Sequence, residues 1–119
     1  MVARKLLIVE DEAITALGLR QALTQLGFEV GIPAGTGEEA VERALSEKPL
    51  CILMDINLIG DMTGIEAVEK INSVSAIHVI YMTGYSNSEM KSRAMQTGPL
   101  AYLEKPVDIA EINRILQNL

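Results

Sequence analysis

The sequence has little of several residue types that small secreted proteins use to stabilise a fold. Its 119 residues include one cysteine, no tryptophan and only 3% aromatic residues. A single cysteine cannot form an internal disulfide. Cys51 lies in an apolar run, which predicts a small buried side chain in a reducing compartment. The sequence therefore excludes an internal disulfide framework.

Long hydrophobic runs are also missing. The first apolar run covers only residues 6–9, whereas a signal peptide needs at least ~7 consecutive apolar residues and a membrane span needs ~20. We therefore expect a cytoplasmic protein with no membrane insertion.

Positive charge is scarce relative to negative charge. Ten Lys and Arg residues stand against sixteen Asp and Glu residues, which gives a net charge of −6. Binding to a phosphate backbone requires clustered cations, so this balance disfavours a direct nucleic-acid interface. The 49% hydrophobic and 22% charged residues are typical of a soluble globular protein. The length predicts a single domain over residues 1–119.

Short apolar runs alternate with amphipathic stretches five times along the chain. The pattern predicts strands at 5–9, 28–32, 50–54, 77–82 and 100–103, and helices at 13–26, 38–47, 65–73, 88–95 and 109–118. Apolar stripes at helical spacing support the first helix through Leu19, Leu23 and Leu26. Strict alternation of strand and helix indicates an α/β fold with one parallel sheet covered on both faces.

The predicted helices carry start and stop signals. Capping boxes pair an oxygen-bearing side chain with an acid three residues later, because the two side chains satisfy free backbone N–H groups. Glycines mark the expected ends of the first and fourth helices. The pairs are Thr36 and Glu39, Thr63 and Glu66, Ser86 and Glu89, and Asp108 and Glu111, and the glycines are Gly27 and Gly98.

Polar side chains follow four of the five predicted strands. Glu10 and Asp11 follow the first strand, Asp55 the third, Thr83 the fourth and Lys105 the fifth. The carboxyl ends of parallel strands share one edge of the sheet, and ligands of open α/β sheets bind there. We therefore expect these side chains to form one site.

The chemistry of this set points to a metal ion and a phosphoryl group. Two unit charges 4 Å apart repel by about 4 kcal/mol at an effective dielectric of 20, so gathered carboxylates need a cation. Mg²⁺ prefers such oxygen ligands. Asp55 could then accept a phosphoryl group as an acyl phosphate. Lys105 would supply a positive charge to the phosphoryl oxygens, and Thr83 a hydroxyl donor.

The set Glu10-Asp11, Asp55, Thr83 and Lys105-Pro106 at successive strand ends resembles the receiver domain of response regulators in two-component signal transduction. The resemblance covers about residues 5–118. It implies a flavodoxin-like (βα)5 doubly wound sheet with the strand order 2-1-3-4-5. It also implies a phosphorylation switch and not a turnover enzyme. Such a switch catalyses only its own phosphotransfer and slow autodephosphorylation.

The resemblance assigns a role to each matching residue. Asp55 is the expected phosphoacceptor. The expected Mg²⁺ ligands are Glu10, Asp11, Asp55 and the backbone carbonyl of Asn57, with Glu10 acting through water. Thr83 and Lys105 would contact the phosphoryl group.

Further expectations concern conformation and partners. Tyr102 matches the switch aromatic of the family, and the Lys105–Pro106 peptide bond is expected to be cis. The expected phosphodonor is a sensor histidine kinase or phosphotransfer protein. A downstream effector would read the surface formed by helix 88–95, strand 100–103 and helix 109–118. The sequence leaves open whether the chain forms a homodimer.

The sequence departs from the family pattern at several positions. Glu10 stands where Asp is more frequent, and the loop from Asp55 to Gly64 is one residue longer than usual and lacks the common proline. Tyr85, two residues after Thr83, could shield an acyl phosphate from water. His78 at a strand start is interpreted as structural.

Three other functions compete with a phosphorylation switch. One is a protein-docking module that has kept the fold without phosphorylation. Another is an Asp-nucleophile phosphatase, but the acids after the first strand lack the required spacing. The third is a nucleotide site, since residues 35–40 match G-x-G-x-x-A before a helix. Glu38 and Glu39 occupy the helix start where pyrophosphate would bind, which disfavours this function.

Overall fold

One parallel sheet, flanked by helices, organises the whole chain. The computed structural model describes residues 4–119. Strands and helices alternate in the order β1 (Lys5–Val9), α1 (Ala13–Gln25), β2 (Glu29–Val30), α2 (Gly37–Glu47), β3 (Cys51–Asp55), α3 (Gly64–Asn72), β4 (His78–Thr83), α4 (Ser88–Met95), β5 (Ala101–Glu104) and α5 (Ile109–Gln117). The strands pair in parallel in the order β2-β1-β3-β4-β5. The expected flavodoxin-like doubly wound fold is therefore confirmed.

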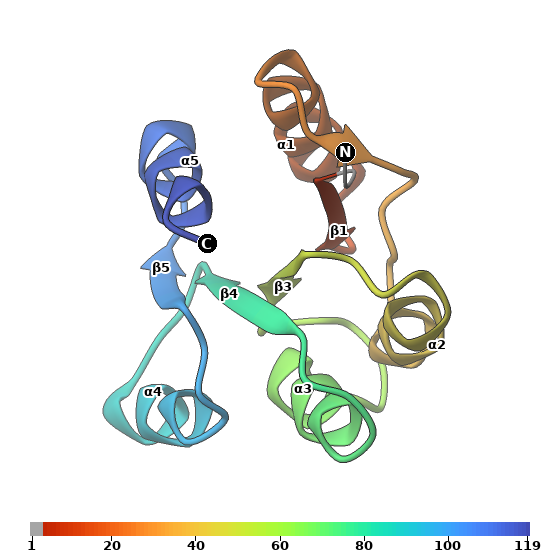
Figure 1. Cartoon of the computed structure of the whole chain (residues 1–119). Helices are drawn as coiled ribbons and strands as arrows, with labels where there is room; N and C mark the ends of the chain where they lie inside the picture. The colour runs from red at the N-terminus through yellow and green to blue at the C-terminus, as the bar shows by residue number, and fades with distance from the viewer. Residues whose placement is uncertain (1–3) are drawn as a thin grey trace.

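Two apolar layers enclose the sheet. α1 and α5 cover one face, and α2, α3 and α4 cover the other (Figure 1). β3 is buried along its whole length because both of its faces are covered. Its last residue is Asp55 and the last residue of β4 is Thr83, so two polar side chains end buried apolar strands.

Within residues 4–119, no helix is long and apolar enough to cross a bilayer.

Two of the expected helix starts match their sequence signals. The Thr63 hydroxyl accepts a hydrogen bond from the backbone N–H of Glu66 at 3.2 Å, and the Glu66 carboxylate accepts one from the N–H of Thr63 at 2.9 Å. α3 therefore begins with a complete capping box. Thr36 caps α2 by accepting from the N–H of Glu39 at 3.1 Å.

The other two starts differ from the predicted pairs. α4 is capped by Asn87 and not by Ser86, whose hydroxyl instead lies 2.6 Å from the Tyr102 hydroxyl. Asp108 caps α5, but it accepts from the N–H of Ala110 and forms no box with the acid three residues on. Both helices are nevertheless capped where the sequence predicts a start.

The second strand and the first helix are both shorter than the sequence predicts. The predicted strand 28–32 is reduced to the two residues Glu29–Val30, and Ile32 is 72% exposed. An edge strand has a partner on one side only, so little holds it beyond its pairing with β1. Leu26 does not join the buried stripe of α1, because Gly27 ends the helix with a φ of 96°.

Two glycines permit close packing beside the expected site. A Cβ on Gly64, the first residue of α3, would collide with the carbonyl oxygen of Asp55. A Cβ on Gly37 would lie 2.8 Å from the Met62 side chain. Gly37, the second glycine of the G-x-G-x-x-A motif, therefore leaves room for Met62 in the loop before α3.

Candidate phosphoacceptor and metal site

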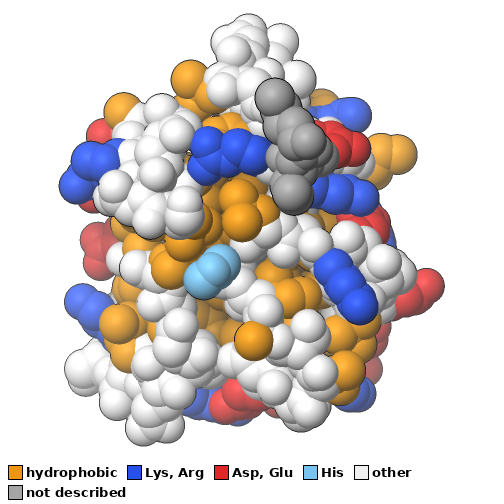
Figure 2. Space-filling view, viewed as in Figure 1, with side chains coloured by type: hydrophobic (Ala, Val, Ile, Leu, Met, Phe, Trp, Pro, Cys, Tyr) orange, Lys and Arg blue, Asp and Glu red, His pale blue; other side chains and the backbone are white. Residues whose placement is uncertain are grey.

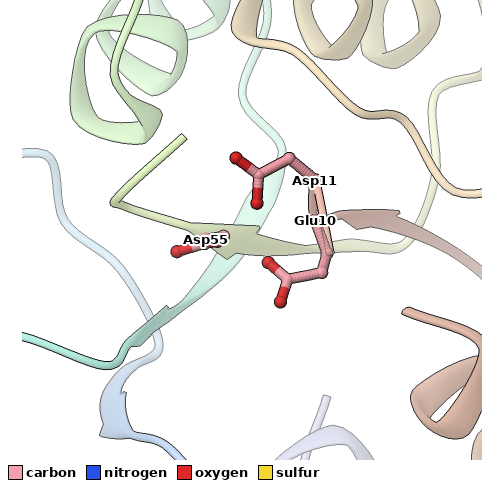
Figure 3. A group of neighbouring side chains, drawn as sticks. All are labelled: Glu10, Asp11 and Asp55. Atoms are coloured by element: carbon pink, nitrogen blue, oxygen red, sulfur yellow. The ribbon is translucent and has the colours of Figure 1, made fainter. Parts of the chain in front are cut away.

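Three carboxylates from two strands meet at the carboxyl edge of the sheet. Glu10 and Asp11 follow β1 and face Asp55 at the end of β3 (Figure 3). One carboxylate oxygen from each lies within 4.8 Å of the others. Such a set of hard oxygen donors fits Mg²⁺. The site therefore has the ligand chemistry that the sequence led us to expect.

Lys105 pairs with the two buried carboxylates of the cluster. Glu10 is 3% exposed and Asp55 is 2% exposed. The Lys105 ammonium donates to the two Glu10 oxygens at 2.8 and 3.1 Å, and to Asp55 Oδ2 at 3.2 Å. The sequence placed Lys105 at this edge, but the pairing with Glu10 was not expected.

Burial dominates the electrostatics of the cluster. It raises the pKa of Glu10 to about 8, and the adjacent Asp55 carboxyl adds to this rise, which Lys105 offsets only in part. Burial alone would lower the pKa of Lys105, but its hydrogen bond to Glu10 and the Asp55 charge raise it overall. Pairing with Lys105 alone therefore does not restore the ordinary pKa of Glu10.

Backbone amides of the loop after β3 hold two carboxylates in place. The N–H of Asn57 donates to Asp55 Oδ1 at 3.0 Å, and the N–H of Ile59 donates to Asp11 Oδ2 at 2.8 Å. Asn57 lines the same open hollow of about 250 Å³ as the three carboxylates, Lys105 and Tyr85. The loop therefore orients the oxygen donors directly.

The Thr83 hydroxyl lies beside the cluster and faces Asn57. Thr83 is buried, and its Oγ1 donates to Asn57 Oδ1 at 2.7 Å. The backbone of Tyr85 also contacts this hydroxyl: its carbonyl is a second acceptor, and its N–H donates to Oγ1 at 3.1 Å. The side chain of Asn57 was not singled out from the sequence, because only the folded chain brings residue 57 to residue 83.

Tyr102 on β5 is half-buried, and its hydroxyl is hydrogen-bonded. Its hydroxyl pairs with Ser86, in the loop between β4 and α4. Its ring lies 6.4 Å from that of Tyr81 at 60°. Tyr81 is fully buried, and its hydroxyl pairs with Thr97 at 2.8 Å. This tyrosine pair was missed from the sequence, although the parallel register of β4 and β5 places the two residues side by side.

Other sequence expectations concern residues around or away from the cluster. The Lys105–Pro106 peptide bond is cis, and the N–H of Lys105 donates to the Thr83 carbonyl at 2.7 Å. His78 begins β4, at the opposite end of the strand from Thr83. Figure 2 shows the histidine in pale blue among hydrophobic side chains. Cys51 is buried, which raises the pKa of its thiol to about 12.

Sequence relatives point to one family. The family described as response regulator receiver domain matches residues 6–117. The transcriptional regulatory protein PdtaR of Mycobacterium tuberculosis is 36% identical over 93% of this chain and 54% of its own length. The sporulation initiation phosphotransferase F of Bacillus subtilis is 31% identical over 94% of this chain and 90% of its own. The chain thus spans about half the length of PdtaR.

Solved structures agree with the sequence relatives. The receiver domain of a modulated diguanylate cyclase from Desulfovibrio desulfuricans has a TM-score of 0.90 at 32% identity, and the match covers 98% of this chain and 93% of the other. The receiver domain of the sensor histidine kinase PA1611 from Pseudomonas aeruginosa, solved with magnesium in its active-site cleft, has a TM-score of 0.86 at 28% identity, covering 98% and 97%. The chain belongs to the response regulator receiver domain family of two-component systems.

Proposed function

We propose that residues 1–119 act as one phosphorylation switch in which Asp55 accepts a phosphoryl group from a phosphohistidine. The observation that carries the proposal is the placement of Asp55: a buried carboxylate within reach of two other acids and one lysine. The donor would be a sensor histidine kinase or a phosphotransfer protein, and we expect the reaction to take place in the cytoplasm.

The proposed transfer needs little chemistry beyond alignment. An Asp55 oxygen attacks the phosphorus, the P–N bond of the phosphohistidine breaks, and the imidazole leaves with the electron pair of that bond. The N–H of Asn57 holds the Asp55 carboxylate in one orientation. Lys105, 3.2 Å from Asp55, places positive charge where the phosphoryl oxygens would arrive.

Glu10, Asp11, Asp55 and the backbone carbonyl of Asn57 are the proposed Mg²⁺ ligands. Bound Mg²⁺ supplies charge that stabilises the phosphoryl oxygens during transfer. The fit rests on the clustered oxygen donors of Glu10, Asp11 and Asp55, which are the kind of ligand that Mg²⁺ prefers. Glu10 would contact the ion through water, as its pairing with Lys105 favours an indirect role.

Exposed apolar side chains on α1 suit a docking partner. Ile14 and Leu17 on α1 are 84% and 57% exposed. Ile14 also lines a groove of about 490 Å³ that reaches Lys105 and Pro106. We assign this groove to a helix of the phosphodonor. Apolar side chains of that helix would pack into the groove and so place the phosphohistidine close to Asp55.

The proposed output is a change in the surface of α4, β5 and α5. Thr83 would turn its hydroxyl to the phosphoryl group, and Tyr102 would leave Ser86 and move inward. A downstream effector would detect the altered surface, which includes Met95, 48% exposed. Tyr85, 65% exposed at the mouth of the hollow, would slow hydrolysis by shielding the acyl phosphate.

Labelling with a small phosphodonor tests the core of the proposal. Acetyl phosphate with Mg²⁺ should add one phosphoryl group to the wild-type chain, detected as a mass shift, and EDTA should prevent it. Asp61→Asn, which removes an exposed acid of the same loop, serves as the matched control and should label normally. Absence of labelling in the wild type would contradict the switch and favour a phosphorylation-independent docking module.

A further inference from the structure

Asn57 contacts both of the residues that the proposed switch must bring together. Its backbone N–H donates to Asp55 Oδ1 at 3.0 Å, while its side-chain oxygen accepts the Thr83 hydroxyl at 2.7 Å. One residue therefore holds the phosphoacceptor through its backbone and Thr83 through its side chain.

The Thr83 hydroxyl has only one proton to donate. In this structure two acceptors, the Asn57 side chain and the Tyr85 carbonyl, lie within hydrogen-bond distance of it. A phosphoryl oxygen on Asp55 would be a third acceptor and carries negative charge, so it forms the stronger bond. The hydroxyl must leave its resting acceptors before it can turn to the phosphoryl group.

We infer that Asn57 is a positioning residue that holds Thr83 in its resting orientation and so sets how readily phosphorylation switches the domain. The inference rests on the proposed function and adds a restraint to it. Each molecule that switches must give up the contact between Asn57 and Thr83, so the contact stabilises the resting state selectively.

Asn57 is suited to a clean test. Its side chain is exposed, so truncation to alanine opens no cavity in the core. Asn57→Ala keeps the backbone carbonyl and the N–H that binds Asp55, and the Thr83 hydroxyl keeps the Tyr85 carbonyl as an acceptor. The variant therefore removes one restraint without leaving a buried donor unpaired.

The first measurement uses metal-free protein. Unfolding of wild type, Asn57→Ala, Thr83→Ala and the double variant forms a thermodynamic cycle. A hydrogen bond between the two side chains predicts non-additivity of about fivefold in the unfolding equilibrium constant. Additive effects would show that Asn57 does not hold Thr83 and would overturn the inference, whatever the chain does with phosphate.

The second measurement uses beryllofluoride, a phosphoryl analogue, together with Mg²⁺. Asn57→Ala should raise the ratio of the beryllofluoride affinity to the Mg²⁺ affinity about fivefold over that of wild type, a ratio that corrects for any change in Mg²⁺ binding. In the Thr83→Ala background the substitution should have no effect. Asn57→Asp keeps an oxygen acceptor, so its beryllofluoride affinity relative to its Mg²⁺ affinity should remain as in wild type.

The outcomes separate the inference from the function on which it rests. Wild-type binding of both probes with an unchanged Asn57→Ala would overturn the role of Asn57 alone. The same gain in the Thr83→Ala background would also overturn it, because the effect would not pass through Thr83. Wild type that binds neither probe would contradict the proposed switch and, with it, the role of Asn57.

Discussion

Two groups of ion pairs in this chain use the same chemistry in different surroundings. On α2, Arg43 pairs with Glu47 at 2.8 Å and with Glu39 at 3.5 Å, one turn away on either side. At the sheet edge, Lys105 pairs with Glu10 and Asp55 at similar distances. The Arg43 hydrogen bond lowers the pKa of Glu47, whereas burial raises that of Glu10 to about 8.

The contrast shows how burial decides what an ion pair does. On the helix surface, pairing satisfies the acids, because water still solvates them. At the sheet edge, desolvation outweighs the pairing for Glu10, so its pKa is raised although Lys105 lies beside it. Carboxylates buried at a strand end therefore contribute little to stability, but their oxygens are well placed to bind a cation.

The largest effect is expected for Asp55→Asn. It should abolish labelling by acetyl phosphate, because the amide cannot form the acyl phosphate. It should also raise the stability of the metal-free protein by about 1 kcal/mol, a rise of several degrees in Tm, since the substitution removes a buried carboxylate that is crowded against Glu10. Labelling by mass spectrometry and thermal unfolding measure the two effects. Unchanged labelling would remove Asp55 from the proposal.

Addition of Mg²⁺ should stabilise the wild type strongly. At about 100 times its dissociation constant the ion should add about 2.7 kcal/mol to the free energy of unfolding. Asp11→Asn should lose most of this gain, while Glu47→Gln on α2 should keep it. Thermal unfolding with and without Mg²⁺ provides the measurement, and equal gains in all three proteins would refute the metal site.

The raised pKa of Glu10 predicts a pH dependence with a definite sign. Between the usual pKa of about 4.5 and the folded value of about 8, the unfolded chain loses this proton while the folded chain keeps it. The metal-free protein should therefore lose stability as pH rises through this window, by at least about 1 kcal/mol. Urea unfolding at pH 5 and pH 8 measures the loss, and Glu10→Gln should reduce it. If Glu10→Gln loses as much stability between pH 5 and pH 8 as wild type, the pH dependence comes from other groups.

The smallest effect is expected on the surface of α2. Arg43→Met should cost about 0.5 kcal/mol, and less at high salt, because ion pairs along a helix surface contribute little. Its Mg²⁺ response should equal that of wild type. Denaturant unfolding at two salt concentrations provides the measurement, and a loss of several kcal/mol would erase the contrast between the two groups.

Much of the fold could be predicted because its signals are local. Apolar runs placed all five strands within a few residues, and side chains such as Thr63 predicted helix starts. The strand order came from resemblance, since nothing local in the sequence specifies which strands are neighbours. The predicted length of β2 was wrong for a related reason, because the length of an edge strand depends on pairing that the sequence does not show.

The site was predictable in its members but not in its contacts. Strand ends gather at one edge by topology, so Glu10, Asp11 and Asp55 could be grouped in advance. Contacts that join distant segments could not. Ser86 and Asn87 can both cap a helix, and only the pairing of Ser86 with Tyr102, 16 residues away, decides between them. The roles of Thr83, Lys105 and Tyr102 in switching remain predictions.

The close approach of Gly64 to the Asp55 carbonyl has a consequence for mutational tolerance. Any side chain at position 64 would push the start of α3 away from the end of β3, where the Asp55 carboxylate is anchored. In a library of random variants, this glycine should therefore be as intolerant of replacement as the aspartate, even though it carries no reactive atom.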